Sequence, residues 1–379
     1  MKNAITILIS LQEKLSNNRG MLFEKTVSDE LNYMNSLKWP TDDFERSFNQ
    51  YKCQFFINNS KFLKIVYEIG AAVVVLPLSL FFFFQHFTLK VEENKYATMA
   101  KDYFALNLMP IDLKNEINKS YAVIEFKRGS LNIKDIPFLA VIFKRYYYRP
   151  LFVLKCIIRV ASYSKMIDMY HPKVICASCE YSCASSVLTA YCEHKGIEHI
   201  NIMHGEKLLT IRDSFTHFDK FYVWDDCYTE LFLQLNGDET EYRVFKPFIP
   251  VFKNEGPGVI KYYLQLHTAE QLSIIKSCLE RIGEPYLVRP HPYHYDEIVR
   301  KSFPEELIEN PDAVSLWDSL KDAKQIVTVN STVALQAFWC EIPVVLDDVS
   351  NPTLFSELEN RQYIMTKKPH KLLSQVIAG

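Results

Sequence analysis

The segment "VIKYYLQLHTAEQLSIIKSCLERIGEPYLVRPHP", from Val259 to Pro292, contains the pattern that decides the fold. An apolar run, VIKYYLQLHT, precedes an amphipathic stretch that ends at Gly283, and a second apolar run, PYLVRPHP, follows. Such apolar runs are typical of buried strands, and a glycine after an amphipathic stretch is typical of a helix C-terminus. The segment therefore predicts a strand, a helix and a parallel strand joined by a right-handed crossover.

The same rhythm continues on both sides of this segment. Towards the C-terminus, SLWDSLKDA and TVALQAFWC predict helices, and QIVTVNS and IPVVLDD predict strands. Towards the N-terminus, the strands KVICAS, IEHINIMHG and KFYVWDD alternate with the helices CASSVLTAYCEHKG and CYTELFLQLNG. Between the two series, residues 246–258 hold three prolines and two glycines and predict a linker.

The chain therefore has two parts of the same class. At 379 residues it exceeds one ordinary domain. We predict an α/β protein of two Rossmann-type domains facing across a cleft, at residues 1–250 and 251–379. Open α/β sheets bind ligands at the carboxyl ends of their strands, so those ends are where a site is expected.

Composition excludes several classes of function. A net charge of -2 argues against a nucleic-acid-binding protein, which is usually basic. The sequence contains neither GxGxxG nor GxxxxGK[ST], so no glycine-rich phosphate loop is expected. Nine cysteines, an odd number, and no cleavable signal peptide indicate reduced thiols in the cytoplasm. Cys176 and Cys179 have the spacing of metal ligands but lack a second pair, and we expect no metal site.

Polar side chains gather where the predicted strands end. In chain order they are Glu180, His204, His267, Thr268, Arg289, His291, Asn330, Ser331, Thr332 and Asp347, and Pro292 belongs to the same set as the neighbour of His291. A set with three histidines, a glutamate, an arginine and a serine–threonine pair is unlike a chance distribution. We expect it to form the ligand site.

Two parts of this set suit a phosphate. His291 lies between Pro290 and Pro292, which restrict the backbone and hold the imidazole beside Arg289. The alternative for His291 is a hydrogen bond to a carbonyl group, and the alternative for Arg289 is an ion pair with a core carboxylate.

The other part is the predicted helix start at Ser331 and Thr332. It offers hydroxyls and unpaired backbone N–H groups, and the helix dipole favours an anion there. The alternative is an ordinary helix N-cap by Asn330 or Ser331, which needs no ligand.

Two stretches are membrane-like. Residues 69–84 are apolar or small apart from Ser79, but the run is shorter than a spanning helix and contains Pro77. Residues 143–159 mix bulky apolar side chains with five Lys and Arg residues, which suits an anionic bilayer surface. Core packing, contact with the membrane surface and a true span are all open for these stretches.

Three motifs, IMHGEK, LVRPHP and IVTVNSTVALQAFWCEIPVV, resemble those of bacterial surface-polysaccharide glycosyltransferases of the GT-B architecture. The resemblance covers residues 172–350 and includes capsule and lipooligosaccharide sialyltransferases and CDP-glycerol glycerophosphotransferases. In the sialyltransferases, HP and ST motifs contact the nucleotide phosphate, which implies that role for His291 with Pro292 and for Ser331 with Thr332.

The resemblance leaves the general base open. The sialyltransferase motif (D/E)(D/E)G is absent here, and the nearest candidate is Glu180. Glu180 capping the following helix is the alternative reading. In the teichoic-acid enzymes a histidine of an HG motif takes this part, which corresponds to His204.

The function implied is an inverting, metal-independent transfer of a sugar from a nucleotide donor. Our best expectation is sialic acid from CMP-sialic acid, moved to O-antigen, capsule or lipooligosaccharide, with no cofactor. The C-terminal domain would bind the donor, with Asp347 on a ribose hydroxyl, and the N-terminal domain the acceptor. We expect the protein in the cytoplasm, with peripheral contact with the inner face of the cell membrane left open. The alternatives are a CDP-glycerol or polyol phosphotransferase, an inactive glycan- or nucleotide-binding subunit, and a sugar-nucleotide epimerase.

Overall fold

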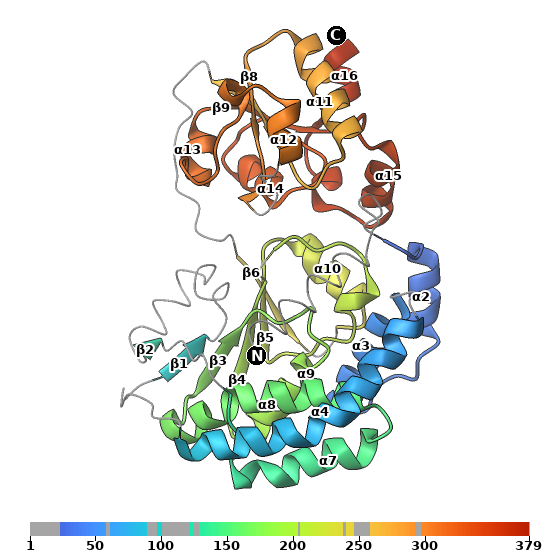
Figure 1. The fold of residues 1–379 in the computed structure, drawn as a ribbon, viewed down its shortest axis with the longest axis vertical. Coiled ribbons are helices and arrows are strands. Elements are labelled where there is room, and N and C mark those ends of the chain that lie inside the picture. The colour runs from blue at the N-terminus through green and yellow to red at the C-terminus, as the bar shows by residue number, and fades with distance from the viewer. Residues whose placement is uncertain are drawn as a thin grey trace. The chain divides into compact units, whose positions relative to one another are not determined.

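The computed structural model describes residues 23–57, 61–88, 97–100, 122–123, 129–203, 205–237, 240–245, 258–292 and 297–378. The chain divides into two compact units, an N-terminal unit within residues 25–248 and a C-terminal unit within residues 249–379 (Figure 1). The C-terminal unit also includes the short segment Glu206–Leu208. The predicted linker lies outside the described residues, apart from Gly258.

The C-terminal unit is built on a five-stranded sheet in the order β11-β10-β9-β7-β8, in which every neighbouring pair is parallel. Its strands are β7 (Val259–Tyr263), β8 (Tyr286–Arg289), β9 (Ala323–Thr328), β10 (Val344–Leu346) and β11 (Lys371–Leu372). Its helices are α11 (Ala269–Ile282), α12 (Glu297–Ser302), α13 (Leu316–Lys321), α14 (Thr332–Trp339), α15 (Pro352–Asn360) and α16 (Leu373–Ala378).

Strand β7 lies at the point where the strand order reverses. The chain leaves β7 through α11 to β8 on one side and later returns as β9 on the other side. Helix α11 begins at a capping box, in which Thr268 and Gln271 each accept the other's backbone N–H, and ends at Gly283 with φ +73°. In open α/β sheets such a reversal is where ligands bind.

The N-terminal unit has a six-stranded sheet in the order β2-β1-β3-β4-β5-β6, again with parallel neighbours. Its strands are β1 (Ala97–Ala100), β2 (Ala122–Val123), β3 (Val174–Ala177), β4 (Glu198–Ile202), β5 (Lys220–Val223) and β6 (Glu241–Val244). Its α-helices are α2 (Val27–Asn35), α3 (Asp43–Ile57), α4 (Lys61–Thr88), α7 (Ile136–Tyr146), α8 (Pro150–Tyr170), α9 (Ser185–His194) and α10 (Asp226–Gln234).

Each unit by itself thus confirms the prediction of Rossmann-type α/β domains, the components of a GT-B protein. The strands predicted from KVICAS to IPVVLDD are present as β3, β4, β5, β7, β8, β9 and β10. Strand β6 was not predicted, because it is an edge strand with mostly exposed residues and lacks the apolar pattern.

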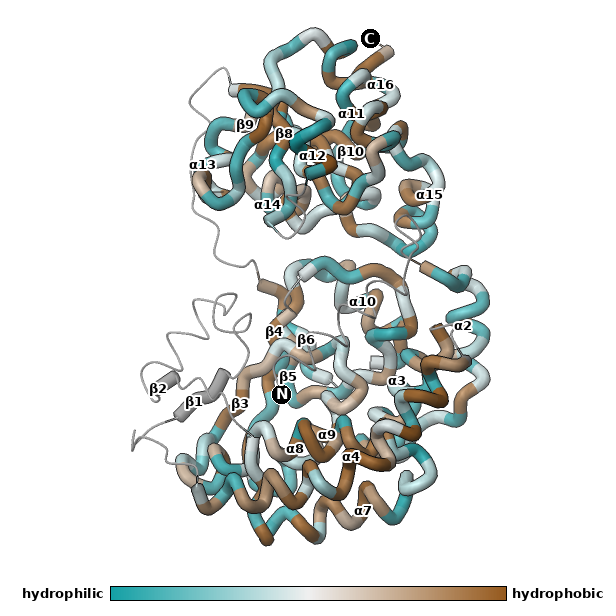
Figure 2. Tube along the Cα trace, viewed as in Figure 1, coloured by the Kyte–Doolittle hydropathy of each residue, from teal (hydrophilic) through white to brown (hydrophobic). Residues whose placement is uncertain are grey.

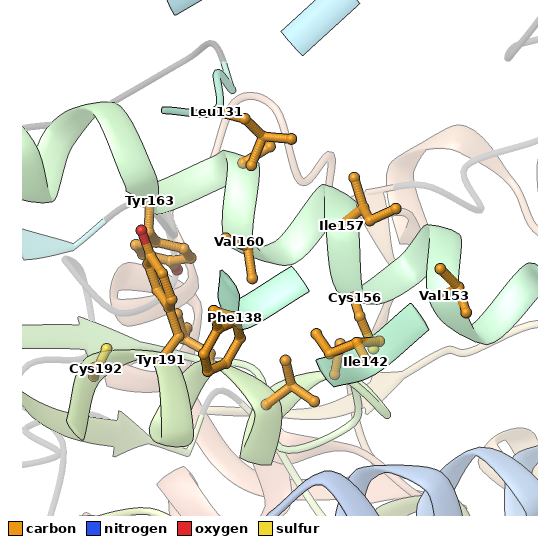
Figure 3. Close-up of a cluster of buried hydrophobic side chains, with 14 of the residues drawn as sticks. Leu131, Phe138, Ile142, Val153, Cys156, Ile157, Val160, Tyr163, Tyr191 and Cys192 are labelled. Atoms are coloured by element: carbon orange, nitrogen blue, oxygen red, sulfur yellow. The ribbon is translucent and has the colours of Figure 1, made fainter. Parts of the chain in front are cut away.

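Helix α8 is at the centre of the core of the N-terminal unit. It packs against α4, α7 and α9, and its buried side chains include Phe152, Cys156, Val160 and Met166. Figure 3 shows Val160 and Ile142 within this cluster. Residues 150–159 of the basic, aromatic stretch therefore begin a core helix, and only its outer side chains remain at the surface.

Helix α4 contains the apolar stretch 69–84, and the structure excludes the interpretation of this stretch as a core helix. Its large side chains are mostly exposed: Ile69, Val73, Leu76 and Phe84 have exposed fractions between 61% and 70%. Figure 2 shows much of α4 in the brown of hydrophobic residues. The helix is long and apolar enough to cross a membrane, by length and composition.

Candidate functional site

The candidate site is a pocket of about 400 Å³ in the C-terminal unit. It lies where β7 and β8 end and where α14 begins, at the reversal of strand order. Its walls are Tyr263, Leu264 and Gln265 after β7, Arg289, Pro290, His291 and Pro292 after β8, Asn330, Ser331, Thr332, Val333 and Gln336 at α14, and Glu206, Leu208, Leu316 and Tyr363. Six of the predicted site residues are therefore brought together: Arg289, His291, Pro292, Asn330, Ser331 and Thr332.

Arg289 lines the pocket, but its guanidinium group is hydrogen-bonded to residues of the core. The side chain is 6% exposed and donates to Glu309 Oε1 at 2.7 Å and to the Val314 carbonyl at 2.8 Å. Lys261 donates to the other Glu309 oxygen at 2.6 Å. Burial alone would raise the pKa of Glu309, but hydrogen bonds from Lys261, Ser319 and Arg289 hold it below its ordinary value. Pairing with a core carboxylate is thus what the structure shows for Arg289.

His291 lies one residue beyond the first of the two prolines at the end of β8. Pro290 is buried, His291 is half-buried and Pro292 is exposed. The chain therefore emerges from the core at His291, and the two prolines limit the backbone angles on either side of it. This position gives the pocket an imidazole on a stiff backbone.

The start of α14 provides hydrogen-bond donors. Ser331 is its N-cap, and Ser331 Oγ accepts the Val333 N–H at 3.2 Å. The hydroxyl of the buried Tyr363 lies 3.2 Å from both the backbone nitrogen and the carbonyl oxygen of Ser331, so it fixes the cap from below. Thr332 follows as the first helical residue and adds a hydroxyl to the pocket wall. The N–H groups of Ser331, Val333 and Ala334 are therefore engaged within the cap. What the start of α14 offers an anion is the Thr332 hydroxyl and the positive end of the helix dipole.

Gln336 is a site residue that sequence reasoning missed. Its side-chain oxygen Oε1 is buried and has no hydrogen-bond partner among the described residues, although Gln336 lines the pocket. Buried acceptors are nearly always paired in folded proteins, so this atom is suited to a donor on a ligand. The available signal was its spacing, because Gln336 follows Thr332 by one helical turn and lies on the same helix face.

Three predicted donor-binding residues are not in the pocket wall. Thr268 is used in the capping box of α11, and His267 Nδ1 pairs with the Gln265 carbonyl at 3.0 Å. Burial lowers the pKa of His267. Asp347 is fully buried and accepts the N–H groups of Val349 and Ser350 at 2.8 Å each, as well as the Tyr262 hydroxyl.

The two predicted bases have different positions. Glu180 is fully buried in the N-terminal unit, where its carboxylate accepts the Asn201 side-chain amide at 3.0 Å. It does not cap the next helix, since the N-cap of α9 is Ala184 and has no side-chain cap bond. His204 lies outside the described residues. Glu206, two residues later in the same IMHGEK motif, is half-buried and lines the pocket.

A second polar pocket of about 490 Å³ lies in the N-terminal unit. Lys155 and Arg159 of α8 line it together with Tyr181 and Ser182 of the loop after β3. Gln54 fixes this loop by donating to the Tyr181 carbonyl at 2.9 Å. No Asp or Glu is among the described residues that line it, so the pocket has a positive wall at the carboxyl end of a parallel strand.

No group of three or more His, Cys, Asp or Glu residues in the described parts of the chain is arranged to hold a metal ion. All nine cysteines are free thiols. Burial raises the pKa of Cys176 to about 12, so this thiol stays protonated near neutral pH.

No protein-family model and no curated protein matches the sequence. Among solved structures, the chain is similar to the wall teichoic acid polymerase TagF, at 7% identity and a TM-score of 0.42 over 90% of each chain. It is similar to the lipopolysaccharide outer core galactosyltransferase WaaB at 11% identity and 0.40, over 75% of this chain and 94% of that one. A protein named as a UDP-N-acetylglucosamine 2-epimerase, from Listeria monocytogenes, matches at 12% identity and 0.43, over 67% and 79%. At these TM-scores the similarities decide neither activity nor substrate.

Proposed function

We propose that the protein is a glycosyltransferase that takes a sugar from a nucleotide donor, and that the donor's phosphate binds in the pocket of the C-terminal unit. The observation that carries this proposal is the convergence of three features on one pocket: His291, the N-terminus of α14, and the buried Gln336 Oε1, which has no hydrogen-bond partner within the described parts of the chain. A volume of about 400 Å³ accommodates a nucleotide.

The phosphate would be held by the hydroxyl of Thr332 and by the positive end of the α14 dipole, with the His291 imidazole beside it. Gln336 Oε1 would accept a hydrogen bond from an N–H or O–H group of the nucleoside. Arg289 would support this wall through Glu309 rather than contact the phosphate itself.

The reaction would be a single displacement. An acceptor hydroxyl oxygen attacks the anomeric carbon, the bond from that carbon to the phosphate oxygen breaks, and the nucleotide leaves with the electron pair. A general base takes the hydroxyl proton, and donors at the phosphate stabilise the charge on the leaving group. No metal is needed for these steps, and the anomeric configuration is inverted.

Among the carboxylates, Glu206 fits the part of the base better than Glu180. Glu206 reaches the pocket, whereas Glu180 is fully buried and bonded to Asn201. His204 stays a candidate from the HG motif.

For the acceptor, we propose the positively charged pocket of the N-terminal unit. Lys155 and Arg159 favour a glycan that carries a carboxylate or a phosphate, such as a charged surface polysaccharide. The free cysteines are consistent with action in the cytoplasm, where such glycans are assembled on carriers.

CMP-sialic acid is the first donor to test, and CDP-glycerol is the second. The purified protein is incubated with each of these and with UDP- and GDP-sugars, in the presence of a lipid-linked glycan extract, and products are identified by mass spectrometry. Transfer that is lost in His291→Ala supports the proposal, since loss of a leaving-group stabiliser costs about a hundredfold in rate. Transfer of glycerol phosphate from CDP-glycerol to the acceptor would show that the protein is a polyol phosphotransferase and not a sialyltransferase. Nucleotide binding with neither transfer nor donor hydrolysis would mean an inactive binding subunit.

A further inference from the structure

Helix α4 and the segment 133–148 expose large apolar side chains on the N-terminal unit, and we call these side chains together the α4–α7 face. On α4 it consists of Phe62, Ile65, Val66, Ile69, Val73, Val74, Leu76, Leu80, Phe81, Phe84 and Phe87, and on the second segment of Ile133, Ile136, Val141, Phe143, Tyr147 and Tyr148. On α4 these residues recur every three or four positions, so they form one stripe along the whole helix. Soluble proteins rarely expose a continuous apolar surface of this length.

Helices α4 and α7 both pack against α8, and α4 is hydrogen-bonded to residues that flank the segment 133–148 on each side. At one end, Glu68 of α4 accepts the Leu151 backbone N–H at 2.9 Å. At the other end, the Phe82 carbonyl accepts the Leu131 backbone N–H at 3.1 Å. A mostly apolar pocket of about 440 Å³ lies between the two parts at this second end, with Phe84 and Ile136 in its wall.

Cations outnumber carboxylates around the face. After Glu68, α4 contains no Asp, Glu, Lys or Arg, and residues 133–165 contain seven Lys and Arg residues but only one acidic residue, Asp135, which is buried. Two of the seven cations are paired, Arg145 with Asp42 and Arg149 with Glu68. The whole chain, in contrast, has a net charge of -2. Lys134 and Lys144, which lie within the segment 133–148, are exposed. An apolar stripe flanked by cations complements an anionic lipid surface.

The other side of α4 is built into the fold, which excludes a span in this structure. Val75 and Phe82 pack against the core cluster of α8, and the Lys165 ammonium donates to the His86 carbonyl at 3.0 Å. The Glu68 carboxylate also accepts the Tyr51 hydroxyl. A helix that crossed the bilayer would give up these contacts and carry Glu68 towards the hydrocarbon.

From this geometry we infer that the α4–α7 face docks the protein on an anionic bilayer, with α4 lying in the plane of the membrane surface. The exposed stripe enters the boundary between head groups and acyl chains, the lysines contact the head groups, and an acyl chain fills the apolar pocket. This inference is independent of the proposed donor and acceptor.

The test is flotation of the purified full-length protein with vesicles of phosphatidylcholine alone and of phosphatidylcholine with phosphatidylglycerol in equal parts. We expect binding to the mixed vesicles and about tenfold weaker binding to the neutral ones. Val73→Glu and Phe84→Glu alter side chains that are 69% and 70% exposed, so the fold is retained, and each should weaken binding at least about tenfold. Leu266→Glu is the matched control, because Leu266 is 48% exposed in the C-terminal unit, and it should bind as the unchanged protein does.

Other outcomes overturn the inference. Equal binding by Val73→Glu and Leu266→Glu would show that another surface docks. Resistance of the bound protein to extraction with alkaline carbonate would show that α4 spans the bilayer. Absence of vesicle binding, together with a dimer in sedimentation that Val73→Glu dissociates, would show that a second copy of the chain covers the face.

Discussion

Replacing Gln336 by methionine separates a ligand-binding pocket from an ordinary cavity. The change keeps the length of the side chain and removes the buried Oε1 that has no partner among the described residues. An unpaired buried acceptor costs about 1–3 kcal/mol, so the free energy of unfolding without nucleotide should stay the same or rise by about 1 kcal/mol. Nucleotide binding should weaken about tenfold, the value of one lost hydrogen bond.

The assay combines urea unfolding without nucleotide and titration calorimetry with CMP, UDP and GDP. Gln375→Met is the matched control. Gln375 lies in α16 and its side-chain oxygen accepts the Leu372 N–H at 3.2 Å. This variant should lose up to about 1 kcal/mol of stability and keep its nucleotide affinity. A loss of stability in Gln336→Met with unchanged affinity would refute the assignment of Gln336 to the site.

Ser331→Ala removes the helix cap as well as a pocket hydroxyl, so it should cost about 1 kcal/mol of stability and weaken nucleotide binding. Thr332→Ala should affect nucleotide binding alone; thermal unfolding with and without nucleotide compares the two variants, and identical behaviour would contradict the separate roles. Arg289→Met leaves the buried carboxylate of Glu309 one cation short and should lower the free energy of unfolding by about 3–5 kcal/mol, whereas an unchanged urea midpoint would show that the pair is dispensable. Burial lowers the pKa of His199 to about 3, so below its ordinary value of 6.5 the unfolded chain binds a proton that the folded chain does not. The neutral His199 therefore stabilises the fold fully above that pH, and the free energy of unfolding falls by about 2 kcal/mol between about pH 6.5 and 5. In His199→Gln, the free energies of unfolding measured in urea at these two pH values should differ less.

The sequence predicted the parallel strands because their residues alternate with amphipathic helices that end at glycine. Gly283 illustrates this, since its φ of +73° closes α11 as the pattern indicated. The sequence also predicted that residues 289–292 and 330–332 line one pocket, because the carboxyl ends of parallel strands lie at the same edge of a sheet. Elements without an apolar pattern, such as β6, could not be found in this way.

The sequence could not predict which polar side chains are hydrogen-bonded within the protein and so are not available to a ligand. Asp347 follows β10 as expected, but it is engaged in a buried turn. Thr268 does not end a strand, because β7 ends at Tyr263 and Thr268 is the N-cap of α11. Glu180 is buried against Asn201, a residue of the neighbouring strand β4. The α4 stripe was equally ambiguous, because composition alone does not tell a buried apolar helix from an exposed one.

A crystal structure with the tightest-binding nucleotide tests the central claim most directly. We expect the nucleotide's phosphate within hydrogen-bond distance of the Thr332 hydroxyl at the start of α14, with the His291 imidazole beside it and Gln336 Oε1 paired with the nucleoside. A nucleotide bound at any other place in the chain, or a pocket that stays empty at saturating nucleotide, would contradict it.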